Sequence, residues 1–260
     1  MKVVIKLGGT LLDDTQTRSS LASQVAELSR RYSIVVVHGG GKQVTKFLEL
    51  QGVQSRFVNG LRVSDEAVVD AVTKVIAGSV NKQLVSALIA AGVQAVGLSG
   101  IDGSLTTAEQ LNPALGFVGR PATTNGKLLD LLAGAGYVPA VACVAGDYNG
   151  VIYNVNADQM AISCASGWGA GRLLFLTDVP GVRGNNGTVF QTLTVAESKG
   201  LIATGVAQGG MQAKLEAAEA AIGAGVEVVT IASGRESNVC QRLLNGERVG
   251  TEICRGEDLQ

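Results

Sequence analysis

Short apolar runs, each ending in glycine or a polar residue, recur along this chain and alternate with longer stretches of helical periodicity. This alternation is typical of a largely parallel sheet covered by helices. We therefore expect an α/β fold, a three-layer αβα sandwich with a mainly parallel central sheet. The runs predicted to form its strands are Val3–Leu7, Ile34–Val37, Ala95–Leu98, Val138–Val141, Leu173–Leu176 and Val226–Ile231.

Three helices are expected in the first third of the chain, over about Arg18–Arg30, Lys42–Leu50 and Asp65–Ala91. The last is the longest, and its apolar residues spread around much of its circumference. A helix on the surface of a domain needs only one apolar stripe to face the core. The excess predicts that a second surface covers this helix, as its twin would in a two-fold dimer.

Turn and capping signals predict further elements. Ser/Thr-x-x-Glu capping boxes indicate helix starts at Thr194 and Ser233, and Asn156 begins a similar pattern. Asn59-Gly60 and Asn149-Gly150 have the composition of hairpin turns. Such hairpins predict extra antiparallel strands on a mixed sheet.

No linker, low-complexity stretch or repeat of fixed period interrupts this pattern. We therefore expect a single domain, residues 1–260, made of two lobes, 1–165 and 166–260. The boundary is expected near residues 155–172, where the half that contains the hairpins gives way to a plainer alternation of strand and helix.

Composition excludes several classes of protein. With 21 basic and 22 acidic residues the net charge is −1, so electrostatics favours neither nucleic acid nor an anionic membrane as a partner. The four cysteines are far apart and there is one histidine, which argues against a structural zinc site and fits a reducing compartment. Lys2 and Lys6 place charge at the N-terminus before the apolar core of a signal peptide could form, so no signal peptide is predicted. No apolar run approaches the roughly 18 residues that a membrane span requires, so no membrane span is predicted. We expect a cytoplasmic protein.

Two glycine-rich loops are the main functional signal in a chain with 35 glycines. Gly8-Gly9 and Gly39-Gly40-Gly41 each follow a predicted strand, and Lys6 precedes the first loop. Backbone N–H groups at a strand end and helix start can bind an anion, and glycine lets a phosphate approach closely. For either loop alone, a tight turn explains the glycines equally well. The two loops and the lysine together favour an anion site.

Three known sequence motifs, for nucleotide binding or ester hydrolysis, are each incomplete in this chain. Gly41-Lys42 lacks the Ser/Thr of a P-loop, and Gly39-x-Gly41 lacks the third glycine of a dinucleotide fingerprint. The sequence His38-Gly39-Gly40-Gly41 resembles an esterase oxyanion loop. However, His38 is the only histidine, and Gly97–Ile101 breaks the Gly-x-Ser-x-Gly elbow at its last residue. Any nucleotide is therefore held by another device.

Polar residues gather at three predicted strand ends or helix starts. Asn154-Val155-Asn156-Ala157-Asp158 lies at a strand-to-helix junction, and Thr177–Val182 closes a buried strand. Lys214 opens an alanine-rich helix after Gly209-Gly210. Taken singly, Asp158 is better explained as a residue that stabilises the helix dipole, and Lys214 as a solvated side chain.

Five motifs together resemble acetylglutamate kinases, members of the amino-acid kinase superfamily, in their order and spacing. The resemblance covers essentially the whole chain and implies the amino-acid kinase fold. One departure is the sequence Ala207-Gln208-Gly209-Gly210-Met211, where the family usually has Thr-Asp/Gly-Gly-Met. The motifs are Lys6-Leu7-Gly8-Gly9, His38-Gly39-Gly40-Gly41, Asn59-Gly60-Leu61-Arg62-Val63, Asn154-Val155-Asn156-Ala157-Asp158-Gln159 and Gly210-Met211-x-x-Lys214.

The resemblance implies transfer of the γ-phosphoryl group of ATP to the side-chain carboxylate of N-acetyl-L-glutamate, the second step of arginine biosynthesis. A glutamate carboxylate has a pKa of about 4.3, so it is already an anion at neutral pH and needs no general base. By the resemblance, Lys6 and Lys214 stabilise the transition-state charge, and Asp158 holds both ammonium groups. Magnesium arrives with ATP, held by phosphates and water, and the protein has no metal site of its own.

The resemblance also implies the binding residues. Arg62 would form a fork with the substrate α-carboxylate, and Asn154 would contact the acetamido group. Gly40 and Gly41 would complete the substrate site with backbone N–H groups. The residues implied for the nucleotide are Gly8, Gly9, Asp178, Val179, Pro180, Gly181, Val182, Arg183, Val206, Ala207 and Gln208.

Assembly and lobes follow from the same resemblance. The lobe of residues 1–165 would bind the acyl acceptor and dimerise, and the lobe of residues 166–260 would bind ATP. Arginine-inhibited hexameric relatives carry an extra helix before the first strand, and here only Met1-Lys2 precede that strand. We therefore expect a homodimer whose activity is indifferent to arginine.

Two alternatives stay open. A kinase acting on glutamate or aminoadipate attached to an amino-group carrier protein is supported by Gly97–Gly103, which is similar to that group, whereas the Asn59–Arg62 block favours a small acetylated substrate. A sensor of amino acids or nucleotides on the same fold, without turnover, would be favoured by loss of Lys6, Asp158 or Lys214. All three are present.

Overall fold

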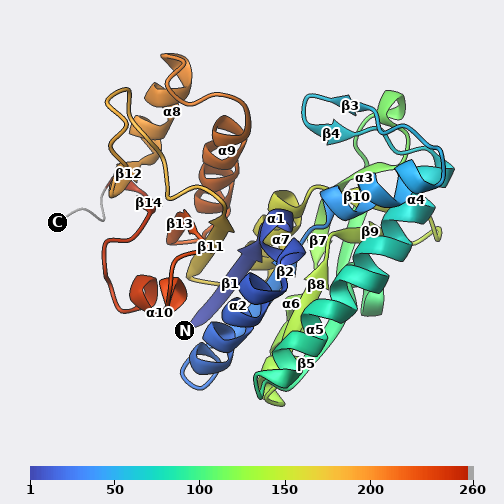
Figure 1. Ribbon diagram of the computed structural model, residues 1–260, viewed down its shortest axis with the longest axis horizontal. Helices are drawn as coiled ribbons and strands as arrows, with labels where there is room; N and C mark the ends of the chain where they lie inside the picture. Colours follow the sequence, from blue (N-terminus) through green and yellow to red (C-terminus); the bar gives the residue numbers. More distant parts are fainter. Residues whose placement is uncertain (257–260) are drawn as a thin grey trace.

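The computed structural model describes residues 1–256, and its centre is an eight-stranded sheet between two layers of helices (Figure 1). Neighbouring strands run parallel except for β13 and β14. The predicted α/β sandwich with a mainly parallel sheet is confirmed. In spatial order the strands are β12 (Thr192–Thr194), β14 (Thr251–Cys254), β13 (Val228–Ser233), β11 (Arg172–Thr177), β1 (Lys2–Leu7), β2 (Ser33–His38), β8 (Val138–Ala142) and β5 (Ala95–Ser99).

Helices cover both faces of this sheet (Figure 1). On one face α2 (Thr15–Leu28) packs between α5 (Asn81–Ala90) and α10 (Val239–Leu244). On the other, neighbouring helices pack in the order α6, α7, α9 and α8. Their bounds are α6 (Gly126–Gly134), α7 (Ala157–Trp168), α9 (Gly209–Gly223) and α8 (Val195–Ala203).

The central strands are buried on both faces, which explains why they read as continuous apolar runs. In β1, Val3, Val4 and Ile5 are fully buried, and Val36 and Val37 of β2 are likewise inaccessible. Because β1 pairs with both β2 and β11, any side chain at its carboxyl end lies in the middle of the molecule.

The long helix predicted over Asp65–Ala91 is present but changes its pitch. It consists of α4 (Glu66–Val72), a π-helical segment (Thr73–Val80) and α5 without a break. A π-helix bonds from residue i to i+5, so it rotates the buried face relative to a regular α-helix. This rotation accounts for the wide apolar circumference. Ile89 is the only large apolar side chain exposed on this helix, and the second covering surface stays a prediction.

Both predicted hairpins form, but neither adds strands to the central sheet, and in this respect the prediction was wrong. Asn59 and Gly60, with φ of 49° and 77°, turn the chain between β3 (Phe57–Val58) and β4 (Leu61–Arg62), which pair only with each other. The hairpin at Asn149-Gly150 belongs to a separate four-stranded sheet that closes on itself. Its strands are β6 (Thr106–Gln110), β7 (Val118–Thr124), β9 (Val144–Gly146) and β10 (Ile152–Val155).

Two of the three predicted helix starts are confirmed. Thr194 and Glu197 form a reciprocal capping box on α8, and Asn156 caps α7 by accepting from the N–H groups of Asp158 and Gln159. The start at Ser233 was wrong. Ser233 ends β13, its hydroxyl accepts from the N–H of Arg235 in a turn, and α10 begins only at Val239.

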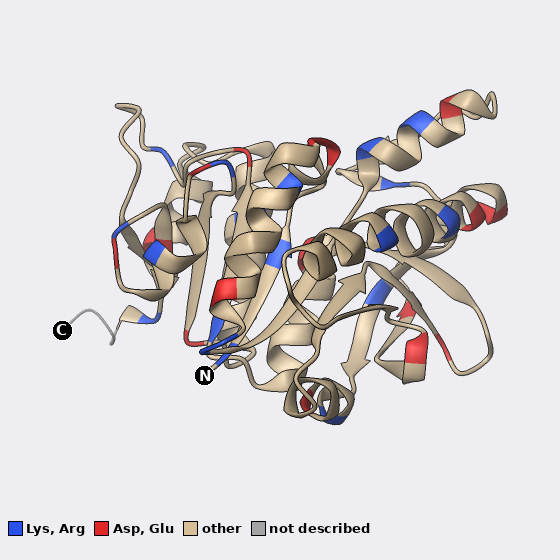
Figure 2. Ribbon diagram, turned by 60° about the horizontal axis from the view of Figure 1, so that its bottom comes forward, with Lys and Arg blue, Asp and Glu red and all other residues tan. Residues whose placement is uncertain are grey.

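Charges of both signs are interspersed over the molecule (Figure 2), in keeping with the net charge of −1. In the described part of the chain, the helices are too short or too polar for any of them to cross a bilayer.

Candidate active site

Three charged residues from distant parts of the chain form one ion-pair cluster. Lys6 lies on β1, Asp158 in the first turn of α7 and Lys214 near the start of α9. Lys6 Nζ lies 2.7 Å from Asp158 Oδ1, and Lys214 Nζ lies 3.7 Å from Asp158 Oδ2. The structure thus brings together the three residues that the sequence predicted as the catalytic set.

Asp158 is the shared partner of both lysines and is 15% exposed. Burial by itself raises the pKa of Asp158, but the charges of Lys6 and Lys214 outweigh burial and hold that pKa below its ordinary value. Asp158 is therefore an anion at neutral pH. Two ammonium groups around one carboxylate leave an excess of positive charge, which suits an anionic ligand.

The two glycine-rich loops lie against each other beside this cluster. A Cβ atom added to Gly9 would lie 3.7 Å from the backbone nitrogens of Gly40 and Gly41. Gly8 donates its N–H to the carbonyl of Leu176 at 2.9 Å, and a Cβ at Gly8 would approach that carbonyl to 3.2 Å. Gly40 is the N-cap of α3 (Gly41–Leu50), so N–H groups at the start of this helix lack helical partners.

A cavity of about 160 Å³ is lined by all four residues predicted to bind the substrate: Gly40, Gly41, Arg62 and Asn154. Asn156 and Ala157 also line it, so the cavity adjoins Asp158 along the chain. The apolar residues that line this cavity were not predicted from the sequence, because the residues around them do not distinguish them from core residues. They are Val44, Phe57, Val72, Ile76, Val118 and Cys143.

Arg62 is buried, with 8% of its surface exposed, and its guanidinium is held by several hydrogen bonds. Its Nη2 donates to the carbonyl of Gly41 at 2.8 Å and to the hydroxyl of Thr45 at 2.7 Å, and Nη1 donates to Ser55 Oγ. The guanidinium also lies over the Phe57 ring, 4.7 Å from its centroid. Burial lowers the pKa of Arg62. Thr45 was missed, although its position four residues after Gly41 places both on one helix face.

Apart from Gly8 and Gly9, the residues predicted for the nucleotide lie on two loops, 178–183 after β11 and 206–208 before α9. Val182 and Ala207 are 1% and 3% exposed, and the N–H of Val182 donates to Thr251 Oγ1 at 2.9 Å. These two side chains belong to the core, so a ligand could reach their positions only through the backbone.

A second cavity, of about 710 Å³, lies between the β3–β4 hairpin and the start of α9. It is lined by Asn59 and Gly60 of the hairpin turn, by Asn156, and by Gly210 and Lys214 of α9. Lys214 therefore faces open space on the side away from the core. Within residues 1–256, no three histidine, cysteine or carboxylate side chains are grouped so that they could hold a metal ion.

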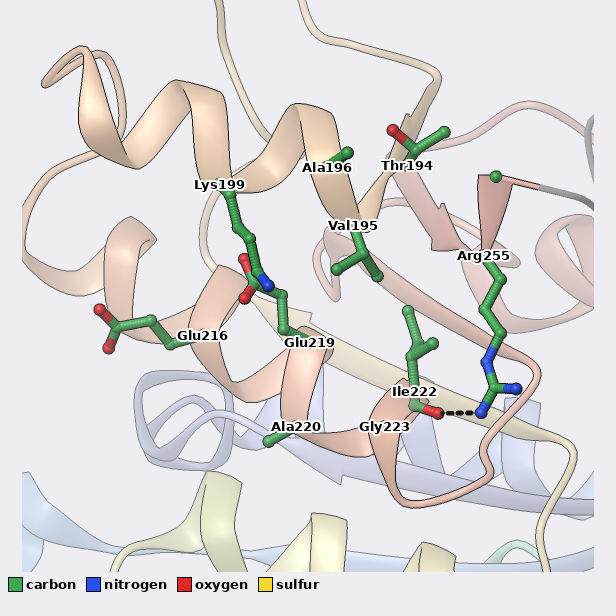
Figure 3. A pocket seen from close by; sticks show the side chains of 11 residues that line it. Thr194, Val195, Ala196, Lys199, Glu216, Glu219, Ala220, Ile222, Gly223 and Arg255 are labelled. Atoms are coloured by element: carbon green, nitrogen blue, oxygen red, sulfur yellow. Dashed lines mark hydrogen bonds between the residues drawn. The ribbon is translucent and has the colours of Figure 1, made fainter.

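A larger cavity, of about 850 Å³, lies elsewhere, between α8 and α9. Figure 3 shows Lys199 and Glu219 directed toward each other there, and Arg255 donating to the carbonyl of Ile222 at 2.8 Å. Burial raises the pKa of Glu219. None of the predicted site residues lines this cavity, so its size alone does not make it the active site.

Comparison with known proteins identifies the family. The model of the amino acid kinase family matches residues 1–233. An acetylglutamate kinase of Solibacter usitatus is 56% identical over 97% of this chain and 99% of its own length, and one of Bartonella quintana is 41% identical over 96% and 88%. A structure of N-acetylglutamate synthase from Neisseria gonorrhoeae, complexed with coenzyme A and N-acetyl-glutamate, superposes with a TM-score of 0.87 at 26% identity. The match covers 98% of this chain but only 59% of that one. The chain belongs to the amino acid kinase family, and within it to the acetylglutamate kinases.

Proposed function

We propose that this protein transfers the γ-phosphoryl group of ATP to the side-chain carboxylate of N-acetyl-L-glutamate, giving an acyl phosphate for arginine biosynthesis. The observation that carries this proposal is the Lys6–Asp158–Lys214 cluster beside a cavity lined by Arg62 and Asn154. The curated relatives with this activity match nearly the whole chain.

The cluster fits the chemistry because the attacking carboxylate is already ionised. Phosphoryl transfer then depends on in-line positioning and on positive charge around the transferring group. Lys6 and Lys214 supply that charge from β1 and α9, and Asp158 keeps the two ammonium groups together. His38 takes no part as a base, since it is fully buried with a pKa of about 4.

N-acetyl-L-glutamate would be bound by Arg62, by Asn154 and by the second glycine-rich loop. Arg62 offers a planar guanidinium that suits the α-carboxylate, and the free N–H groups at the start of α3 suit an anion. Asn154 faces the acetamido group. The apolar walls of the cavity accommodate the methyl group of the acetyl substituent.

ATP is expected on the other side of Lys6. Gly8 and Gly9 would face its phosphates, and the loops 178–183 and 206–208 would lie along the nucleotide. Asp158 is occupied by the two lysines, so magnesium would be held by the phosphates and water. Bound in that way, it neutralises charge on the triphosphate.

The carrier-protein alternative is not favoured, because the similar curated relatives act, by their names, on acetylglutamate. A non-catalytic sensor is not favoured either, since the ion-pair cluster is complete. Trapping of the acyl phosphate with hydroxylamine tests all three. We expect hydroxamate from N-acetyl-L-glutamate with ATP, and little from free glutamate or aspartate. Turnover of a carrier-linked substrate alone, or no turnover at all, would favour an alternative.

The lobes and the assembly stay predictions. We propose that residues 1–165 bind the acyl acceptor, that 166–260 bind ATP, and that two copies form a homodimer in the cytoplasm. Support for the dimer comes from β5, an edge strand with no second neighbour among the described residues, and from exposed Ile89 on the adjoining α5. Light scattering measures the assembly, and a monomer or a hexamer would contradict it.

A further inference from the structure

Ser64 is a completely buried serine that follows β4 and is anchored through its backbone. Its N–H donates to the carbonyl of Leu115 at 3.0 Å, and its carbonyl accepts from the N–H of Phe117 at 2.6 Å. The carbonyl of Phe117 in turn accepts from the N–H of Asn154 at 2.9 Å. One residue, Phe117, therefore fixes the backbones of Ser64 and Asn154 relative to each other.

The Ser64 hydroxyl forms a directed chain of hydrogen bonds. Its Oγ lies 2.9 Å from the carbonyl oxygen of Arg62 and 3.0 Å from Asn154 Nδ2. A carbonyl can only accept, so the single hydroxyl proton is committed to Arg62. Ser64 Oγ is then an acceptor toward Asn154, and the Asn154 atom that faces it has to be the NH₂ group. The orientation of this amide is thus determined by donor and acceptor chemistry.

The other end of the Asn154 amide remains available. Asn154 lines the substrate cavity, and within residues 1–256 no protein group donates to its Oδ1. With Nδ2 turned to Ser64, the atom that Asn154 offers to a ligand is a hydrogen-bond acceptor.

We propose that Ser64 is a positioning residue, which holds Asn154 so that Oδ1 selects a ligand with an N–H donor beside its carboxylate. This inference rests on the proposed function, because the N–H would be that of the acetamido group. An ester oxygen in the same place carries no proton and would set two acceptors against each other. A site built to hydrogen-bond a substrate N–H discriminates strongly against the analogue that lacks it.

The test compares N-acetyl-L-glutamate with its ester analogue 2-acetoxyglutarate, in which oxygen replaces the N–H. For the unmodified protein we expect kcat/KM to favour the amide by about tenfold or more. Ser64→Ala lets the Asn154 amide turn, so this ratio should fall toward one, mainly through a higher KM for the amide. The KM for ATP should not change. Ser198→Ala, which removes a fully buried serine hydroxyl on α8, should keep the original ratio.

Ser64→Cys guards against a folding defect in the alanine variant. The thiol is close in size but a poor hydrogen-bond partner, so the ratio should fall here as well. Equal use of amide and ester by the unmodified protein would overturn the inference, as would an unchanged ratio in a folded Ser64 variant. Failure of the unmodified protein to phosphorylate N-acetyl-L-glutamate would instead overturn the proposed function.

Discussion

Lys214 lies 3.7 Å from the carboxylate of Asp158, whereas Lys6 approaches the same carboxylate to 2.7 Å. Lys6 stands on a central strand that is paired on both sides, and Lys214 on a helix that borders an open cavity. The closer pair therefore fixes Lys6, while Lys214 keeps more freedom to follow an anion into the site.

The two lysines should be essential for the rate of phosphoryl transfer. Lys6→Ala and Lys214→Ala should each lower kcat by about 10²-fold or more, because one preorganised donor to the transition-state charge contributes roughly 3 kcal/mol. Steady-state kinetics measures this. Lys199→Ala, on the neighbouring helix α8 and outside the cluster, serves as the control and should keep its kcat. Near-normal kcat in either cluster variant would remove that lysine from the catalytic set.

Arg62 should act on substrate binding rather than on ATP. Arg62→Lys keeps the charge but loses the fork that now reaches Thr45 and Ser55, so the KM for N-acetyl-L-glutamate should rise about tenfold. The KM for ATP should barely move. Arg56→Lys, at an exposed position before the same hairpin, should leave both constants unchanged. A rise in the KM for ATP alone would place Arg62 on the nucleotide side.

Adjacent glycines of the second loop should respond differently to alanine. A Cβ at Gly40 would press on Ile76 and Val80 at 3.2 and 3.3 Å, whereas a Cβ at Gly41 meets nothing within 4 Å. Gly40→Ala should therefore lower the free energy of unfolding by about 1 kcal/mol. Gly41→Ala should fold normally and raise only the KM for the acetylated substrate. Denaturant titration and kinetics separate the two effects, and equal stability losses would contradict this reading.

Stability should fall in mild acid because of His38. Burial lowers the pKa of His38 to about 4. Its Nε2 accepts from the amide of Asn81, and its Nδ1–H donates to the carbonyl of Gly39. The unfolded chain, with an ordinary pKa of about 6.5, binds more protons between these values, so stability decreases as the pH falls through this window.

The loss between pH 6.5 and pH 4 should amount to about 3 kcal/mol. Denaturant titrations at several pH values measure it. His38→Gln keeps an acceptor for Asn81 but does not titrate, so its stability should depend less on pH over the same range. An equal slope in both proteins would show that His38 is not the cause.

The sequence predicted the central sheet well because its strands are short apolar runs with distinct ends. Val3–Leu7 and Leu173–Leu176 both proved to be neighbouring central strands. The sequence also singled out Lys6, Asp158 and Lys214, the residues of the ion-pair cluster, since each lies in a recognisable motif. The resemblance supplied their common role, which periodicity alone could not.

Other features depend on tertiary contacts that a local pattern does not contain. β6 and β7 are built of polar and small residues such as Thr106 and Thr124, whose hydroxyls lie 3.0 Å apart across the pair. The π-helical pitch at Thr73–Val80 widens the apolar circumference of this helix, and the sequence alone does not distinguish it from a regular α-helix with excess apolar residues. At Ser233, the capping pattern is satisfied by a turn after a strand instead of by a helix.

The order of the central strands decides where the two substrates can meet. The chain goes from β1 to β2 on one side and later places β11 on the other, all in parallel, which makes the carboxyl end of β1 a topological switch point. In open α/β sheets, connections leave such a point in opposite directions and a crevice opens between them. With the lobes assigned as proposed, an acceptor on the β2 side and a donor on the β11 side would face each other across Lys6. Loop sequences around the crevice can therefore diverge, to accept other acids, without moving the point of transfer.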